Sequence, residues 1–191
     1  MNKIKSYKEL KDYIKHDLFR YMSSISKKSF LRAYFIPGFR YTFWLRFCQW
    51  SKTNENKIFF FIGRYLLYHY SIKYGIIIPY QTTIGKGLYI GHFSCIVINS
   101  NSIIGENVNI SQGVTIGQKN GGSRNGSPII GDKVYIGAGA KVIGNCQIGN
   151  NVVIGANCVV TKNINDGAVA VGIPMKIISY CGSVNYVGSF F

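Results

Sequence analysis

The sequence predicts a mainly β protein in which a parallel β-helix of hexapeptide coils follows an α-helical N-terminal segment. The first observation is a six-residue repeat of Ile or Val, which fits neither a helix of 3.6-residue period nor an alternating strand. The second is a glycine directly after eight of the twelve repeat positions, where it permits a tight turn at low steric cost. The third is a change of composition near residue 80, from basic and aromatic to rich in Gly, Ile, Val and Asn.

The N-terminal segment reads as helices. Residues 5–22 carry mixed charge with helical apolar spacing, and a break at Pro37 and Gly38 precedes an aromatic stretch over 39–50. A third stretch, 58–74, ends at Gly75, a typical helix stop. We therefore expect residues 1–75 to form a basic, aromatic, α-helical segment.

The repeat begins after this segment and slips in phase twice, by two residues near 102–103 and by eight between 122 and 129. Its members are Ile84, Ile90, Ile96, Ile104, Ile110, Ile116, Ile130, Ile136, Val142, Ile148, Ile154 and Val160. Three hexads make one triangular coil, so twelve predict four coils, or five if Ile78 begins another. We place the β-helix domain at 76–171 and a C-terminal extension at 172–191, because the sequence from 172 to 180 breaks the pattern.

Composition excludes several classes of protein. With 47% hydrophobic and 15% charged residues, the chain can bury a core and is not disordered. It has no apolar run long enough for a membrane span, and its charged N-terminus lacks a signal peptide's apolar stretch. Five cysteines without CxxC spacing argue against a disulfide framework or a zinc site, and we expect a cytoplasmic protein.

Two features of the coils are candidates for catalysis and substrate binding. His92 is the only histidine in the coil region and occupies the third place of its hexad, where other coils have polar residues. A neutral imidazole at such an outward turn can accept a proton near pH 7. The eight-residue slip enlarges the loop 117–128, in which adjacent glycines permit close backbone approach and Arg124 can bind an acceptor. An ordinary surface histidine and a solvated loop are the alternatives.

Over residues 75–178 the chain resembles the hexapeptide-repeat acyltransferases, specifically serine acetyltransferases and their polysaccharide-modifying relatives. The stretches that carry the resemblance are GLYIGHFSCIVINSNSIIG, NISQGVTIG, GGSRNGSP, VYIGAGAKVIGNCQIG, VVIGANCVV and AVGIPMKII. The resemblance implies a left-handed parallel β-helix and homotrimers with sites in grooves between neighbouring prisms.

The resemblance also implies roles for individual residues. His92 corresponds to the general base, which deprotonates a hydroxyl that attacks acetyl-CoA directly. No metal is implied. The residues expected to contact acetyl-CoA are Ala138, Ala156, Gly117, Lys162 and Lys176. The residues expected to contact the acceptor are Arg124, Asn125 and Asn109. Tight turns explain the two alanines equally well, and solvation explains the lysines.

Three departures from the serine acetyltransferase pattern guide the choice of acceptor. Ile77 stands where the family has the aspartate that supports the histidine, Gly91 replaces a second aspartate, and Asn125 replaces the loop histidine. Without these acidic groups, serine is a poor acceptor, so we expect O-acetylation of a saccharide on a capsular, extracellular or lipid-linked glycan. The alternatives are serine O-acetyltransferase and a non-catalytic scaffold. A single coil histidine excludes a zinc carbonic anhydrase.

Charge divides unevenly along the chain. Residues 1–80 have 15 basic and 4 acidic residues, a net charge of +11, and the rest of the chain adds +4 to reach the total of +15. Basic and aromatic residues suit the surface of an anionic membrane, so we expect association of 1–75 with the inner face of the cytoplasmic membrane. Packing of these aromatics between subunits is the alternative. No nucleic-acid module accompanies the charge, so we expect no nucleic-acid partner.

Overall fold

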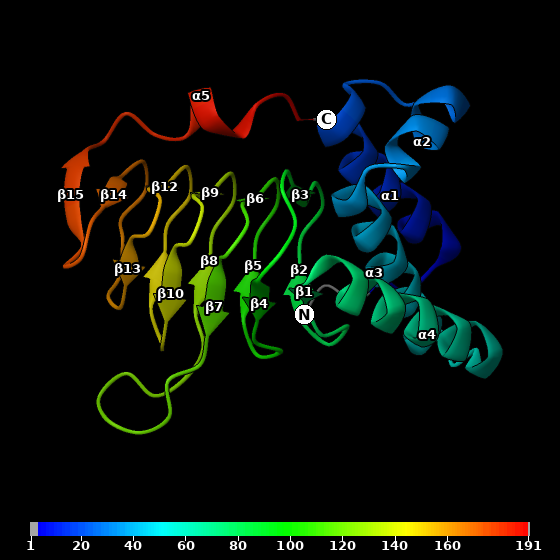
Figure 1. Cartoon of the computed structure of the whole chain (residues 1–191), viewed down its shortest axis with the longest axis horizontal. Coiled ribbons are helices and arrows are strands. Elements are labelled where there is room, and N and C mark those ends of the chain that lie inside the picture. The colour runs from blue at the N-terminus through cyan, green and yellow to red at the C-terminus, as the bar shows by residue number, and fades with distance from the viewer. Residues whose placement is uncertain (1–3, 191) are drawn as a thin grey trace.

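A computed structural model describes residues 4–190 and consists of a prism of stacked coils with a bundle of helices at one end (Figure 1). The helices are α1 (Tyr7–Met22), α2 (Lys27–Tyr34), α3 (Pro37–Thr53) and α4 (Lys57–Tyr74). Side chains of Ser6, Ser26 and Asn56 cap α1, α2 and α4, and proline stands at the start of α3. Helix α2 was not predicted from the sequence. Within residues 4–190, no helix combines the length and apolar composition needed to cross a membrane.

The prism has three sheets, here called A, B and C. Sheet A contains β1 (Ile76–Ile77), β4 (Ile96–Ile98), β7 (Thr115–Gly117), β10 (Lys141–Ile143) and β13 (Val159–Val160). Sheet B contains β2 (Thr83–Ile84), β5 (Ile103–Ile104), β8 (Ile129–Ile130) and β11 (Gln147–Ile148). Sheet C contains β3 (Tyr89–Ile90), β6 (Asn109–Ile110), β9 (Tyr135–Ile136), β12 (Val153–Ile154), β14 (Val169–Val171) and the antiparallel β15 (Lys176–Ser179).

The repeated Ile and Val side chains fill the prism. All twelve repeat positions are buried, with exposures of 0–3%. Strands that are equivalent in successive coils pair in parallel, so each coil covers the apolar layer of the next. The predicted parallel β-helix is confirmed, and the five strands of sheet A show that the prism has five levels.

The glycines that follow repeat positions serve close approach between coils. At Gly105 a Cβ would lie 2.6 Å from the carbonyl oxygen of Gly131, and at Gly131 it would lie 2.8 Å from that of Gly149. These glycines are not at positive φ. For these two glycines the constraint is therefore the stacking of coils at the corner between sheets B and C, and not the turn conformation predicted from the sequence.

The register corrects the position of the first phase slip. Val97 pairs with Thr115 and Ile98 with Ile116, so Ile98 rather than Ile96 is equivalent to Ile116. Ile98 and Ile104 are then one hexad apart, and the two extra residues lie before β4, in the turn that contains His92. The predicted slip near 102–103 is wrong because Ile96 and Ile98 are both buried isoleucines, which periodicity cannot distinguish.

A buried ion pair joins the helices to the first coil. Arg46 of α3 donates from Nε to Asp17 of α1 over 2.9 Å, and both side chains are almost fully buried. The same guanidinium donates to the carbonyl oxygens of Ile84 and Gly85, at 2.8 and 2.6 Å. Asp17 also accepts the backbone N–H of Leu88 at 2.9 Å. These bonds satisfy backbone groups at the open end of the prism.

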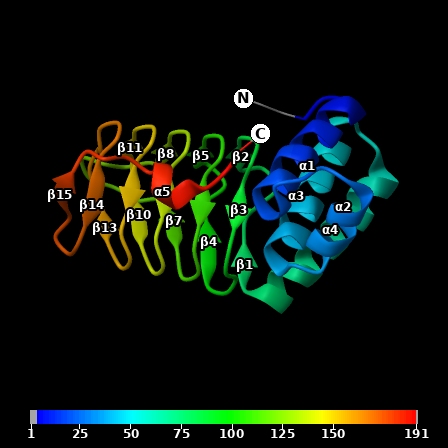
Figure 2. The same ribbon diagram turned by 90° about the horizontal axis from the view of Figure 1, so that it is seen from above.

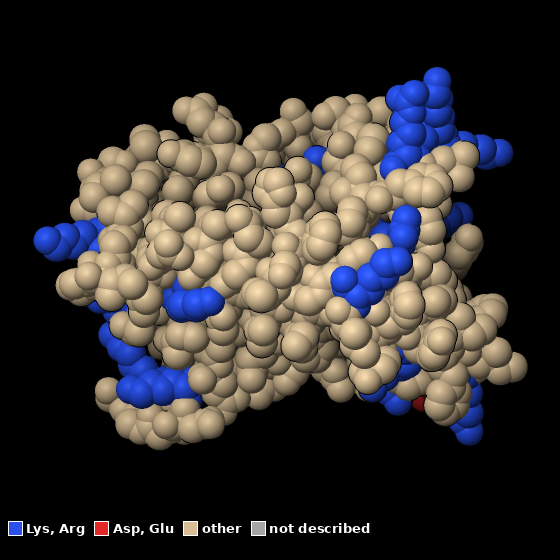
Figure 3. Space-filling model, viewed as in Figure 1, with Lys and Arg blue, Asp and Glu red and all other residues tan. Residues whose placement is uncertain are grey.

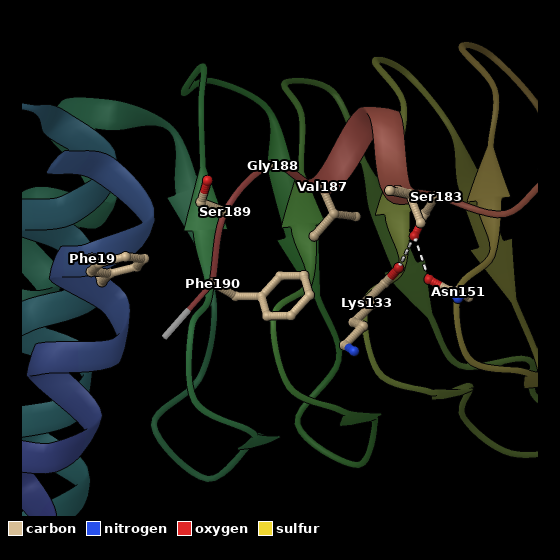
Figure 4. Close-up of a pocket in the computed structure, with 9 residues that line it drawn as sticks. Phe19, Lys133, Asn151, Ser183, Val187, Gly188, Ser189 and Phe190 are labelled. Carbon is tan, nitrogen blue, oxygen red and sulfur yellow. Dashed lines mark hydrogen bonds between the residues drawn. The ribbon is translucent and has the colours of Figure 1, made fainter. Parts of the chain in front are cut away.

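The C-terminal segment turns back along sheet C toward α1 (Figure 2). It contains the short helix α5 (Val184–Val187), and Arg20 of α1 donates to the carbonyl oxygen of Val187. Figure 4 shows the pocket beneath this segment, where Ser183 is hydrogen-bonded to Lys133 and Asn151. The segment therefore ties the last coil to the helices.

Candidate functional site

His92 lies at one corner of the prism, where each coil passes from sheet C to sheet A. The residues at the equivalent place in successive coils are His92, Gln112, Ala138 and Ala156. Backbone hydrogen bonds stack these turns: Gly113 donates to Ser94, Gly139 to Gln112 and Asn157 to Ala138, at 2.8–2.9 Å. We call this column the His92 corner.

The turn that carries His92 differs from the others in its column. It contains the two extra residues, and Ser94 and Cys95 adopt positive φ of 95° and 54°. The His92 side chain is exposed, and no hydrogen bond from residues 4–190 holds its ring. The imidazole is therefore open to a substrate hydroxyl, as expected for a general base.

Beyond Gln112, the His92 corner has only short side chains. Ala138 is half-buried and Ala156 is exposed, and both lie on the same edge as His92. Coils stack about 4.8 Å apart, so Ala156 lies three steps, or about 14 Å, from His92 along this edge. Lys176 begins β15 and pairs with Val171, which places it next to the far end of the same edge. The structure thus brings His92, Ala138, Ala156 and Lys176 onto one edge.

The other predicted residues lie at the opposite end of the sheet A strands. The loop 117–128 leaves the carboxyl end of β7, and Lys162 follows the carboxyl end of β13. Because sheet A is parallel, its amino ends, which include the His92 corner, form the other edge of the sheet. Within one chain, Gly117, Arg124, Asn125 and Lys162 are therefore separated from His92.

The loop itself is ordered against the next coil. Lys119 and Gly126 exchange two backbone hydrogen bonds of 3.0 and 3.1 Å, and the carbonyl oxygen of Arg124 accepts the N–H of Asn145. The Arg124 side chain is half-buried, and Asn125 is exposed at the loop surface. The loop projects away from the prism (Figure 1). It can therefore reach a neighbouring molecule.

Asn109 does not fit its predicted role in acceptor binding. It is 7% exposed on sheet C, beneath the C-terminal segment. Its Oδ1 accepts from Arg20 at 2.5 Å and its Nδ2 donates to the carbonyl oxygen of Tyr186 at 3.0 Å. The side chain holds the C-terminal segment in place, and sequence could not show this because the three residues are far apart along the chain.

Aromatic residues beside the His92 turn escaped the sequence analysis. The Phe93 ring lies 5.4 Å from that of Tyr74, which stacks on Tyr70. Arg40 donates to the Tyr74 hydroxyl at 3.1 Å. No sequence pattern links these positions, because the helices place them here only through tertiary packing.

Carboxylates are absent from the His92 corner within residues 4–190. The three acidic residues of the coils, Glu106, Asp132 and Asp166, lie at the corner between sheets B and C. There Asp132 accepts the N–H of Glu106 and Asp166 that of Asn150, at 2.7 and 2.8 Å. Ile77, on β1, borders an apolar cavity together with Val97 and Cys95. Ile77 and Gly91 stand where serine acetyltransferases have aspartates. No other acidic residue within 4–190 takes the place of those aspartates at the His92 corner.

A five-level prism of parallel hexapeptide coils with an exposed histidine at one corner is a fold that this chain shares with known transferases. Residues 127–162 match the family described as "Bacterial transferase hexapeptide (six repeats)". The chain is 35% identical over 146 residues to a serine acetyltransferase of Synechococcus elongatus, covering 76% of this chain and 59% of that protein. Over 110 residues it is 47% identical to a serine acetyltransferase of Staphylococcus aureus strain Mu50, covering 56% of this chain and 51% of that protein.

Solved structures of serine acetyltransferases have folds similar to that of this chain. A serine acetyltransferase from Brucella abortus strain S19 has a TM-score of 0.78 at 26% identity and covers 93% of this chain and 72% of its own. A serine acetyltransferase from Neisseria gonorrhoeae, solved in complex with serine, has a TM-score of 0.75 at 27% identity, covering 91% and 71%. The chain is therefore similar to hexapeptide-repeat transferases over residues 127–162, and serine acetyltransferases are its relatives in both sequence and fold.

The predicted saccharide acceptor is wrong. The relatives and the structural neighbours described above are serine acetyltransferases, which favours the alternative acceptor, and the resemblance to polysaccharide-modifying enzymes is not supported. The prediction rested on three single-residue departures, and the similarity to serine acetyltransferases extends over more than a hundred residues around them. The chain spans between 51% and 59% of the length of the two curated relatives described here.

Proposed function

We propose that this chain transfers acetyl from acetyl-CoA to the hydroxyl of serine. The observation that carries the proposal is the exposed His92 at the head of an edge that has only small side chains beyond Gln112. Two similar solved structures support the choice of substrates. One is a serine acetyltransferase in complex with serine, and the other is a serine acetyltransferase in complex with Coenzyme A.

His92 supplies the proton transfer in this proposal. Its neutral imidazole takes the proton of the acceptor hydroxyl as the oxygen attacks the acetyl carbonyl carbon. The new C–O bond forms, the C–S bond breaks, and the imidazolium returns the proton to the departing sulfur. Backbone N–H groups of the stacked turns or Gln112 are the candidates for stabilising the oxyanion.

The His92 corner fits the extended arm of acetyl-CoA. Ala138 and Ala156 place no long side chain along the edge beyond Gln112, so an extended chain can lie against the coils. Lys176 stands near the far end, where its ammonium group can meet a phosphate. A ligand about 14 Å long would span the distance from His92 to Ala156.

A homotrimer would complete the site. His92 and Arg124 lie at opposite ends of sheet A, so one chain cannot bring both to the same acceptor. In a ring of parallel prisms, the projecting loop of one copy reaches the His92 corner of the next. Gly117, Asn125 and Lys162 would then serve the site of the neighbouring copy, and Arg124 would bind the acceptor carboxylate.

Release of CoA thiol from acetyl-CoA tests the function directly. We expect release with serine and none with alanine, which lacks the hydroxyl but keeps the amine and carboxylate. Light scattering on the same sample should show a trimer. Release with a different hydroxyl compound and not with serine would refute the acceptor, and an active monomer would refute the shared site.

Restoring the missing carboxylate should improve catalysis. The resemblance places the histidine-supporting aspartate at Ile77, whose side chain is 55% exposed, so Asp can be tolerated there. A carboxylate that orients His92 and stabilises its imidazolium should raise kcat/KM for serine at least tenfold in Ile77→Asp.

The matched control is Val97→Asp, which introduces the same charge at the residue that pairs with Ile77 on the next strand. It borders the same cavity and is 40% exposed. We expect no gain from it. Equal effects of the two variants on kcat/KM would indicate a general charge effect and contradict the specific role of position 77.

A further inference from the structure

The outer face of α4 is mainly apolar along its length and is interrupted by the exposed His69. Its exposed side chains recur at three- and four-residue intervals, with exposures of 65–73%, and are Ile58, Phe61, Tyr65, Tyr68 and Ile72. The opposite face packs on α3, where Gly63 lies against Cys48, and Leu67 is buried. The helix therefore has an inner contact with α3 and an outer apolar face that residues 4–190 leave uncovered. We call this the α4 face.

The α4 face is wider than a single helix–helix seam. Ile62 is also exposed, at 45%, and widens the apolar arc on one side. Phe59, which is 42% exposed, marks the border with the inner contact, because its ring lies 5.9 and 6.1 Å from the rings of Phe47 and Trp50 on α3. A coiled-coil partner needs only a narrow stripe. At its C-terminal end the α4 face borders a cavity, which Tyr68 and Ile72 line together with Ile77 and Val97 of sheet A. Such a surface suits an extended, flat, apolar partner.

Positive charge surrounds the α4 face. Lys57, Arg64 and Lys73 are exposed on the same helix. Helices α2, α3 and α4 contain no Asp or Glu, and between Asp17 and Glu106 the only acidic residue is Glu55. Figure 3 shows blue side chains distributed over the helical part and almost no red on this side of the molecule.

We propose that the α4 face docks on the surface of an anionic lipid bilayer. Its exposed residues combine aliphatic and aromatic side chains with Lys and Arg, the composition of helices that lie in a membrane interface. Tyrosine rings suit the headgroup level, and long basic side chains reach the lipid phosphates from there. Packing of the α4 faces of two copies against each other is disfavoured, because it would bring together two helices whose charged side chains are all positive.

Vesicle flotation of the full-length chain tests the docking. Wild type should float with vesicles of phosphatidylcholine and phosphatidylglycerol, and much less with phosphatidylcholine alone. Lys57→Gln/Lys73→Gln should weaken partitioning about 30-fold on anionic vesicles, since each basic residue near the surface contributes about a factor of five. High salt should have a similar effect.

Apolar contacts are tested by Ile58→Gln/Phe61→Gln, which should weaken partitioning at least tenfold. The control is Ile178→Gln/Val184→Gln, which changes two side chains of similar exposure, 63% and 73%, on the prism side. The control should bind vesicles like wild type. Both variants should keep the wild-type midpoint of thermal unfolding and the wild-type rate of thiol release in vesicle-free solution.

Three results would overturn the proposal. They are equal binding to neutral and anionic vesicles, unchanged binding of the Ile58→Gln/Phe61→Gln variant, and a change of oligomeric state in that variant. The last would show that a second copy covers the face. Thiol release is measured without vesicles, so failure of docking and failure of the proposed acetyl transfer are distinguishable.

Discussion

Replacing His92 by Ala should lower the rate of acetyl transfer about 10²- to 10⁴-fold, the usual contribution of a general base. Its imidazole is exposed and has no hydrogen bond to residues 4–190, so the substitution removes the base without removing a hydrogen bond that holds the fold. Binding of CoA depends on other positions along the edge and should be unchanged. The loss should therefore appear in kcat and not in the affinity for CoA.

Steady-state thiol release and a CoA titration by calorimetry separate these two quantities. His69→Ala is the matched control, because His69 is also exposed but lies on α4, where its ring contacts Tyr70. We expect that variant to keep wild-type turnover. Full activity of His92→Ala would refute the assignment of the base, and loss of CoA binding would indicate a binding role instead.

Breaking the buried pair between Asp17 and Arg46 should have the largest effect on stability. In Arg46→Met, the carboxylate of Asp17 stays buried at 1% exposure without its cation, and the carbonyl oxygens of Ile84 and Gly85 lose their donor. Breaking a buried ion pair on one side costs about 3–5 kcal/mol. For a chain of this size the unfolding midpoint should fall by roughly 6–20 °C.

Thermal and urea unfolding followed by circular dichroism measure this loss. The comparison variant is Lys86→Met, which breaks the exposed pair between Lys86 and Asp12. Its side chains are 30% and 42% exposed, so its contribution should be below about 1 kcal/mol. Equal losses in the two variants would contradict the view that burial makes the Arg46 pair strong.

The hydrogen bond from Lys86 also lowers the pKa of Asp12. A carboxyl whose pKa is lowered on folding stabilises the protein above its unfolded pKa, and that stabilisation disappears as the pH falls through the folded pKa. Any contribution of this pair is therefore confined to pH values above the carboxyl titration. It is small because both side chains are partly exposed.

Much of the fold could be predicted because the repeat is local. Each hexad places a branched residue inside and small or polar residues at the turns, so the period alone indicates stacked coils. The position of the first slip could not be predicted, because Ile96 and Ile98 are chemically equivalent and only the pairing of Ile98 with Ile116 distinguishes them. The prediction of a saccharide acceptor failed because it rested on single residues such as Ile77 and Gly91. The similarity to serine acetyltransferases extends over more than a hundred residues.

By itself, the sequence determined the parallel β-helix, the helical N-terminal part and an exposed histidine at a turn, because each follows from side-chain chemistry at short spacing. Only the tertiary structure decided that Asn109 holds the C-terminal segment, that the loop with Arg124 lies at the opposite end of sheet A from His92, and that α4 leaves an apolar face uncovered. These properties depend on which distant segments meet in space. Coil stacking and helix packing determine those contacts, and neither leaves a signal at short spacing along the chain.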